Sequence, residues 1–189
     1  MDSWRSIAKW PVYALALALV GCAAHDNLPS YGAVSNFTLI DQTGENFKSD
    51  SLTGHVWVAN FMFTNCPGPC PRMSSQMHEV QAALAGQDVK LVSMTVDPDR
   101  DTPEKLAKYA AFYSATPGVW YFLTGPRETL DKLGWDVFKL NHVDGSFDHS
   151  TRFVLVDRKS EIRGFYLTSE PDAIQRVIAD AKALLRQRS

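Results

Sequence analysis

Two apolar runs separated by a helical pattern constrain the fold of this chain more than any other feature. The run HVWVANFMFT, residues 55–64, is almost continuously apolar and rich in β-branched and aromatic side chains, and VKLVSMTV, residues 89–96, repeats the pattern. Such runs are typical of strands buried on both faces of a sheet. Between them, methionine, valine and leucine recur at spacings of four, three and four, which predicts a helix from Pro71 to about Ala85. A strand, a helix and a second strand of this kind indicate an α/β domain.

The rest of the chain continues the alternation of strands and helices. Strands alternating with helices, followed by a last hairpin and a last helix, predict an α/β domain with a thioredoxin-like fold, in which helices flank a central mixed sheet. A chain of 189 residues with 45% hydrophobic residues can bury one such core. The expected further elements are a hairpin of residues 37–40 and 45–47, strands over 120–123, 138–140, 151–157 and 161–167, and helices over 103–114, 128–133 and 171–186.

The first 22 residues have the pattern of an export signal. Arg5 and Lys9 precede an apolar run, residues 12–20, that is too short to cross a bilayer as a helix. The run ends in LVGC, which resembles the bacterial lipobox, whose cysteine is lipidated; here that is Cys22. We therefore expect an exported, membrane-anchored lipoprotein facing the periplasm or another extracytoplasmic space. The alternatives, an uncleaved anchor helix or a plain signal peptide cut nearby, would export the domain as well.

Residues 23–36 separate this signal from the domain, which we expect to span 37–189. The segment is polar, contains Pro29 and Gly32, and shows no helical or strand periodicity. This composition predicts a flexible tether that lets the domain reach away from the membrane.

The cysteine count narrows the chemistry of the mature domain. Of three cysteines, assignment of Cys22 to lipid leaves Cys66 and Cys70. A disulfide across so short a loop would remove little entropy from the unfolded chain, and a domain of this size needs no covalent crosslink. The pair is therefore expected to be chemical rather than structural: a redox couple or a metal site.

The loop FMFTNCPGPCPRM, residues 61–73, suits both chemistries. Pro71 fits the first turn of a helix, which places Cys70 near the helix N-terminus, where the partial positive charge favours a thiolate. Thioredoxin-like oxidoreductases have two residues between their cysteines, whereas three here, residues 67–69, give a wider loop that can present both sulfurs to one ion. Thiolates favour Cu(I), and Zn(II) is also possible.

A third ligand would complete such a site, and the chain has five histidines. His149 directly precedes the predicted strand 151–157, at a loop edge that a thioredoxin-like domain places beside the cysteine loop. A single histidine is more often structural than a ligand, so the pattern alone leaves its role open. Met73 and Met77 could offer sulfur, but their helical spacing indicates core residues.

The charge of the chain excludes one class of partner. A net charge of −2 without a cluster of Lys and Arg offers no surface for phosphate backbones. We expect no binding to nucleic acid.

Three motifs in order, TNCPGPCP, VDPDRDTPEKLAKYAAFY and DHSTRFVLVD, resemble the SCO/SenC family of copper-binding assembly factors for cytochrome c oxidase. The resemblance covers about residues 35–185. It implies a thioredoxin-like fold in which Cys66, Cys70 and His149 bind copper as Cu(I) or Cu(II). Family members commonly have an acidic residue within the cysteine loop, whereas this chain has glycine and proline there.

The resemblance leaves two functions to be separated. A copper metallochaperone would pass copper to the binuclear copper site of cytochrome c oxidase subunit II. A thiol-disulfide oxidoreductase would use Cys66 and Cys70 as a redox pair to reduce the cysteines of that site or other exported thiols. Other periplasmic copper carriers or thiol-disulfide proteins are further expected partners. Asp97, at the end of the second apolar strand, is a candidate for holding a ligand in place. A peroxidase of the same fold is disfavoured because its usual cysteine context is absent.

Overall fold

A seven-stranded mixed sheet runs through the part of the chain that the computed structural model describes, residues 28–147 and 149–187. Its strands lie in the order β2-β1-β5-β4-β3-β6-β7. Strands β3, β4 and β5 are parallel, and the remaining pairs are antiparallel. The strands are β1 (Thr38–Asp41), β2 (Asn46–Lys48), β3 (Val56–Met62), β4 (Val89–Thr95), β5 (Trp120–Thr124), β6 (Arg152–Val156) and β7 (Ile162–Leu167).

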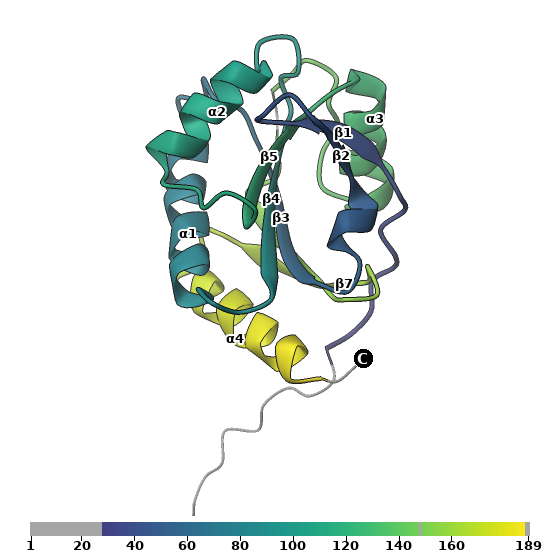
Figure 1. The fold of residues 1–189 in the computed structure, drawn as a ribbon, viewed down its shortest axis with the longest axis vertical. Coiled ribbons are helices and arrows are strands. Elements are labelled where there is room, and N and C mark those ends of the chain that lie inside the picture. Colours follow the sequence, from purple (N-terminus) through teal and green to yellow (C-terminus); the bar gives the residue numbers. More distant parts are fainter. Residues whose placement is uncertain (1–27, 148, 188–189) are drawn as a thin grey trace, which may run out of the picture.

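Helices cover both faces of this sheet (Figure 1). The α-helices are α1 (Cys70–Ala83), α2 (Pro103–Phe112), α3 (Arg127–Lys132) and α4 (Ala173–Arg186), with a short 3-10 helix η1 (Ser49–Leu52) and a π-helical turn η2 (Leu133–Val137). Helices α1, α2 and α4 lie on one side of the sheet, and α3 with η2 lies on the other. The predicted α/β domain with a central mixed sheet is confirmed.

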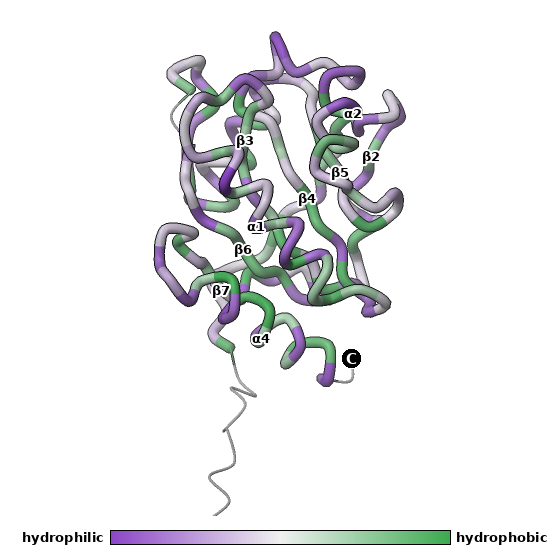
Figure 2. Tube along the Cα trace, turned by 90° about the vertical axis from the view of Figure 1, so that its left-hand side faces the viewer, coloured by the Kyte–Doolittle hydropathy of each residue, from purple (hydrophilic) through white to green (hydrophobic). Residues whose placement is uncertain are grey.

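Strand β3 forms the middle of the core because both of its faces are covered. Every residue from Val56 to Met62 is buried. Ala59 pairs with Val92 of β4 on one side and with Val154 of β6 on the other. The hydrophobic residues follow these central strands (Figure 2). The apolar run therefore reflects burial on both faces, as the sequence predicts.

One predicted strand is wrong: residues 138–140 form no strand. Phe138 N donates to Leu133 O at 2.8 Å, and Leu140 N donates to Gly134 O at 2.9 Å, so these backbone groups are used within the π-helical turn. Lys139 has a φ of 53°, which is incompatible with an extended strand. Phe138 is apolar because it packs edge-on against the rings of Trp57 and Phe61.

The described part of the predicted tether, residues 28–36, is bound to the domain, which corrects the expectation of a free segment there. Tyr31 N donates to Ile162 O at 2.9 Å, Ile162 N donates to Gly32 O at 2.8 Å, and Val34 N donates to Ser160 O at 2.7 Å. The segment thus pairs with the outer edge of β7, and the Val34 side chain is buried. The polar composition of residues 28–36 did not indicate this pairing, because backbone N–H and C=O groups make its hydrogen bonds.

None of the helices among the described residues is long and apolar enough to span a bilayer. The predicted signal, Cys22 and residues 23–27 lie outside the described residues.

Candidate metal centre

The two cysteines lie where the central strand passes into a helix. Strand β3 ends at Met62, and Cys70 is the first residue of α1. Both thiols are free; Cys70 is buried and Cys66 is half-buried. Pro69 precedes the helix and Pro71 occupies its first turn, as the sequence predicts. One sulfur therefore faces the interior, and the other lies at the solvent edge.

His149 reaches the same place from a distant part of the chain. Strand β6 is antiparallel to β3, so the residues before β6 meet the carboxyl end of β3. The His149 Nε2 atom lies 3.1 Å from Cys70 Sγ and 4.0 Å from Cys66 Sγ. The three ligand atoms all lie within 4.8 Å of one another, so one ion can contact all three. The structure brings together the residues that the family resemblance implies as ligands.

The hydrogen bond of the second imidazole nitrogen fixes the orientation of His149. Its Nδ1 lies 3.2 Å from Ser150 O. A carbonyl oxygen only accepts, so Nδ1 carries the hydrogen and Nε2 presents its lone pair to the cysteines. The Phe63 ring packs against the imidazole at 5.8 Å, nearly perpendicular to it. This is the tautomer that a metal ligand needs.

Burial raises the pKa of the Cys70 thiol far above its usual value. Loss of solvation is the main cause; a backbone hydrogen bond at Phe63 opposes it, while Cys66 and the carboxylate of Asp101 add to it. This differs from the expectation that the helix N-terminus favours a thiolate at Cys70, because desolvation outweighs the helix field. A bound cation would supply the missing stabilisation, since thiolate ligands lose their protons when metal binds.

Asp101 holds the start of the cysteine loop. Its buried carboxylate accepts from Thr64 N at 3.1 Å, from Thr64 Oγ1 at 2.5 Å and from Thr95 Oγ1 at 2.6 Å. Asp101 also precedes α2, but the N-cap of that helix is Thr102, whose hydroxyl accepts from Lys105 N. Two sequence features could have indicated this role of Asp101 in holding the loop. One is an acidic residue in the turn after strand β4, and the other is a threonine just before the CxxxC motif that follows the neighbouring strand β3.

Asp97 contacts the site only indirectly. Its buried carboxylate pairs with the guanidinium of Arg100 rather than with a cysteine or His149. That guanidinium lies 4.6 Å from the centre of the Phe147 ring, which packs on Phe63 at 5.5 Å. Any effect of Asp97 on the ligands would therefore pass through the loop that carries His149.

A second network, which sequence reasoning missed, joins α1, which begins at Cys70, to the segment that leads from His149 into β6. Arg72 Nη2 and Gln76 Nε2, both on α1, donate to Thr168 O at 3.1 and 3.0 Å. The Thr168 N and Oγ1 atoms then donate to Thr151 O, two residues after His149, at 2.9 and 2.7 Å. No local sequence pattern identifies Thr168, because its role arises from the meeting of three separate elements.

The π-helical turn supports the histidine loop from beneath. A Cβ atom added to Gly134 would lie 2.4 Å from Asn141 O, so only glycine fits there. Asn141 is buried, and its Oδ1 accepts from Ser150 N at 3.4 Å. The turn thereby places an amide next to His149.

A family model described as SCO1/SenC matches residues 26–186. The chain belongs to the SCO1/SenC family. A curated relative from Stutzerimonas stutzeri, described as a putative copper-binding protein, is 31% identical over 161 residues, which are 80% of this chain and 78% of the relative.

Solved structures of SCO1/SenC proteins have the same fold. A SCO1/SenC family lipoprotein from Bacillus anthracis superposes with a TM-score of 0.74 at 32% identity, covering 80% of this chain and 94% of that one. BsSco, described as a member of the Sco family of cytochrome c oxidase assembly proteins with a disulfide switch, also has a TM-score of 0.74, at 31% identity, covering 86% of this chain and 98% of that one. The thioredoxin-like fold is confirmed.

Proposed function

We propose that this chain is a copper metallochaperone. It holds one copper ion through Cys66 Sγ, Cys70 Sγ and His149 Nε2, and passes the ion to the binuclear copper site of cytochrome c oxidase subunit II. The observation that carries the proposal is the convergence of these three atoms within 4.8 Å. The oxidase assembly role of BsSco and the description of the S. stutzeri relative support the choice of cargo and client.

The donor set fits copper in both oxidation states. Two thiolates satisfy Cu(I), a soft ion, and the imidazole adds the nitrogen donor that Cu(II) prefers. The Ser150 carbonyl holds the imidazole in the tautomer that binds through Nε2. The cysteine loop contains no Asp or Glu, and its centre is Gly68 and Pro69. No carboxylate of the loop therefore competes for the ion.

The unequal burial of the two sulfurs suits transfer by ligand exchange. Cys70 is buried and anchors one side of the ion, whereas Cys66 lies at the solvent edge. A thiol or imidazole of the client can approach from the Cys66 side and replace the ligands one at a time. Each sulfur released from copper takes up a proton, which the raised pKa of Cys70 makes favourable.

Anaerobic copper titration of the reduced domain, residues 23–189, tests the proposal. We expect one copper per chain, and loss of tight binding in Cys66→Ser and in Cys70→Ser because each substitution removes a thiolate. Ser75→Ala is a matched control: its exposed hydroxyl donates to Pro71 O within α1 and is not one of the three proposed ligands. Wild-type affinity in either cysteine variant would refute the copper site.

A thiol-disulfide oxidoreductase is the second candidate, favoured by the free, adjacent cysteines and by the disulfide switch described for BsSco. His149 separates the two functions. Thiol exchange depends on the cysteine pair, whereas copper retention depends on all three ligands.

Oxidase assembly in cells decides between them. For a carrier, His149→Ala should impair assembly about as much as loss of either cysteine, and added copper should partly restore it by mass action. Near-normal oxidase activity of the His149→Ala strain under copper limitation, with both cysteine variants inactive, would favour the reductase.

We further propose that the chain is exported and anchored through a lipid on Cys22. The lipobox-like ending of the apolar run supports this, as does the solved family relative described as a lipoprotein.

A further inference from the structure

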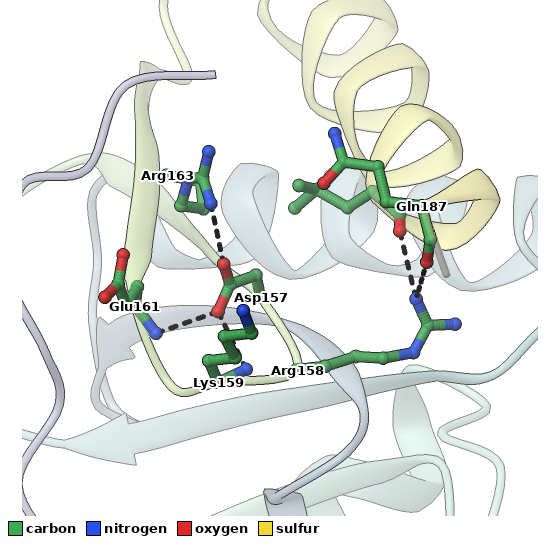
Figure 3. Close-up of a pocket in the computed structure, with 7 residues that line it drawn as sticks. Asp157, Arg158, Lys159, Glu161, Arg163 and Gln187 are labelled. Atoms are coloured by element: carbon green, nitrogen blue, oxygen red, sulfur yellow. Dashed lines mark hydrogen bonds and ion pairs between the residues drawn. The ribbon is translucent and has the colours of Figure 1, made fainter. Parts of the chain in front are cut away.

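The chain is fixed to the domain from Leu28 onward by an arginine clamp. Arg163 donates from Nε to Pro29 O at 3.0 Å, from Nη2 to Leu28 O, and from Nη1 to Asp157 Oδ2 at 2.8 Å. Arg163 and Asp157 are both largely buried, and their pairing is visible in Figure 3. Leu28 packs against the core. The chain is therefore held to the domain at Leu28 and Pro29, and by the β7 pairing that follows them.

This clamp leaves a short connection to the proposed lipid. Six residue steps separate Cys22 from Leu28, and a fully extended chain covers at most about 3.6 Å per step, or about 22 Å in all. A tether of residues 23–36 would allow more than twice that reach. The corner of the domain that carries Leu28 is thus held close to the bilayer.

The metal centre lies at the far end of the same strand. Asp157 directly follows the carboxyl end of β6, whereas His149 precedes its amino end. Seven residue steps from Ser150 to Asp157 correspond to about 24 Å of extended strand. In Figure 1 the N-terminal segment joins the lower end of the domain, near the end of α4. The clamp and the copper ligands therefore occupy opposite ends of the domain.

Basic side chains surround the clamp, a local cluster that the net charge of the whole chain did not indicate. Arg158 donates from Nη1 to Leu184 O at 3.0 Å and to Gln187 O at 3.2 Å, which brings the end of α4 to the β6–β7 turn (Figure 3). Lys159 on this turn and Arg186 on α4 are exposed. One further acidic residue, Glu161, lies beside the Asp157–Arg163 ion pair. A surface of this charge is attracted to anionic lipid headgroups.

We propose that this surface, the β6–β7 turn with the end of α4, sits on the anionic headgroups of the membrane that carries the Cys22 lipid. The proposed copper ligands then point away from the bilayer, toward the aqueous side. This inference rests on the proposed lipid attachment and is independent of copper binding.

Energy transfer to labelled lipids tests the orientation. A lipidated Cys66→Ser, Cys70→Ser chain receives one new cysteine for a donor dye, either Gln187→Cys at the clamp end or Asn65→Cys at the copper end. The chains are reconstituted in vesicles of phosphatidylethanolamine and phosphatidylglycerol with acceptor dye on headgroups. We expect transfer from position 187 to exceed transfer from position 65 at least about twofold, because roughly 24 Å of strand separates the two ends.

Two variants separate the short connection from the surface charge. Ten Gly and Ser residues inserted between Asn27 and Leu28 should reduce the difference, and Lys159→Glu should reduce it too, whereas Lys105→Glu on exposed α2 should not. Equal transfer from both positions, a reversed order, or absence of lipid on Cys22 would overturn the proposal. Copper titration of the same domain, with its native cysteines, reports separately on the proposed function.

Discussion

At the scale of single residues, the two cysteines of the candidate metal centre differ in their access to solvent. Cys70 is buried and its pKa is raised by loss of solvation, whereas Cys66 lies partly in solvent. The thiolate is the reactive form of cysteine, so a raised pKa leaves Cys70 protonated and unreactive at neutral pH.

We therefore predict that iodoacetamide modifies Cys66 before Cys70 in the reduced, copper-free domain. The rate at Cys70 should keep rising as the pH becomes alkaline, because its thiolate fraction increases only as the pH approaches the raised pKa. Mass spectrometry of the cysteine peptides gives both rates, and the single serine variants identify each site. Equal rates at pH 7 would contradict the burial of Cys70.

Substitution of the histidine should separate the two oxidation states of copper. His149→Ala should retain Cu(I) through two sulfurs but lose the Cu(II) form, because only the imidazole supplies nitrogen. Absorption and electron paramagnetic resonance spectra of the Cu(II) protein test this. His142→Ala is the matched control, since that imidazole pairs with Asp131 and stacks on Trp135. An unchanged Cu(II) spectrum in His149→Ala would remove this residue from the site.

The three residues of the candidate site could be picked out from sequence, but the residues that position them could not. Cys66, Cys70 and His149 lie in short motifs that resemble a known family. Thr168 and Asn141 act through hydrogen bonds between elements that are far apart in the chain, and no local spacing records such contacts. Asp101 lies just before a helix, where a polar residue has an ordinary explanation as a cap, so its place in the sequence did not indicate its hydrogen bonds to Thr64.

At the scale of elements, the distance between the proposed copper ligands depends on how α1 docks against the start of β6 and the end of β7. Thr168 is the link, since its carbonyl binds α1 and its hydroxyl and N–H bind Thr151. Side chains that orient metal ligands commonly affect metal affinity although they do not touch the ion.

Thr168→Val should therefore weaken Cu(II) binding by about 10-fold to 100-fold while the domain stays folded. The substitution removes the 2.7 Å hydroxyl bond to Thr151 and should also lower the free energy of unfolding by about 1 kcal/mol. Thr43→Val, which loses a hydroxyl bond in the distant β1–β2 turn, controls for the general effect. Competition titration with a chelator measures affinity, and urea unfolding measures stability. Unchanged affinity with lowered stability would limit Thr168 to a structural role.

The strands and helices that sequence predicted well are those with a strong burial pattern. Strand β3 is buried on both faces and α1 buries Met73, Met77 and Val80, so each shows the expected spacing. The predicted strand over residues 138–140 was wrong because one buried aromatic side chain and its neighbours have the pattern of a strand when their backbone contacts are unknown. The bound segment 28–36 was missed for the same reason: it is held by its backbone and by one distant arginine.

At the scale of the whole molecule, we predict that Cys22→Ser removes the lipid without unfolding the domain. The Arg163 clamp on Leu28 and Pro29 is left intact by this substitution, so the domain keeps its attachment of the N-terminal segment. Metabolic labelling with a fatty acid measures lipid attachment, and circular dichroism checks the fold. Fractionation alone is insufficient, because an unprocessed apolar segment would still hold the chain at the membrane. Lipid incorporation in Cys22→Ser would show that another residue is the acceptor.

The segment from Tyr31 to Val34 also has a consequence for self-association. It occupies the outer edge of β7, where unpaired N–H and C=O groups would otherwise invite a strand from another molecule. A recombinant domain cut at Phe37, the boundary that the sequence pattern suggests, would leave this edge bare. Such a protein is expected to exchange strands between copies or to aggregate, whereas one that begins at Leu28 brings its own protective strand.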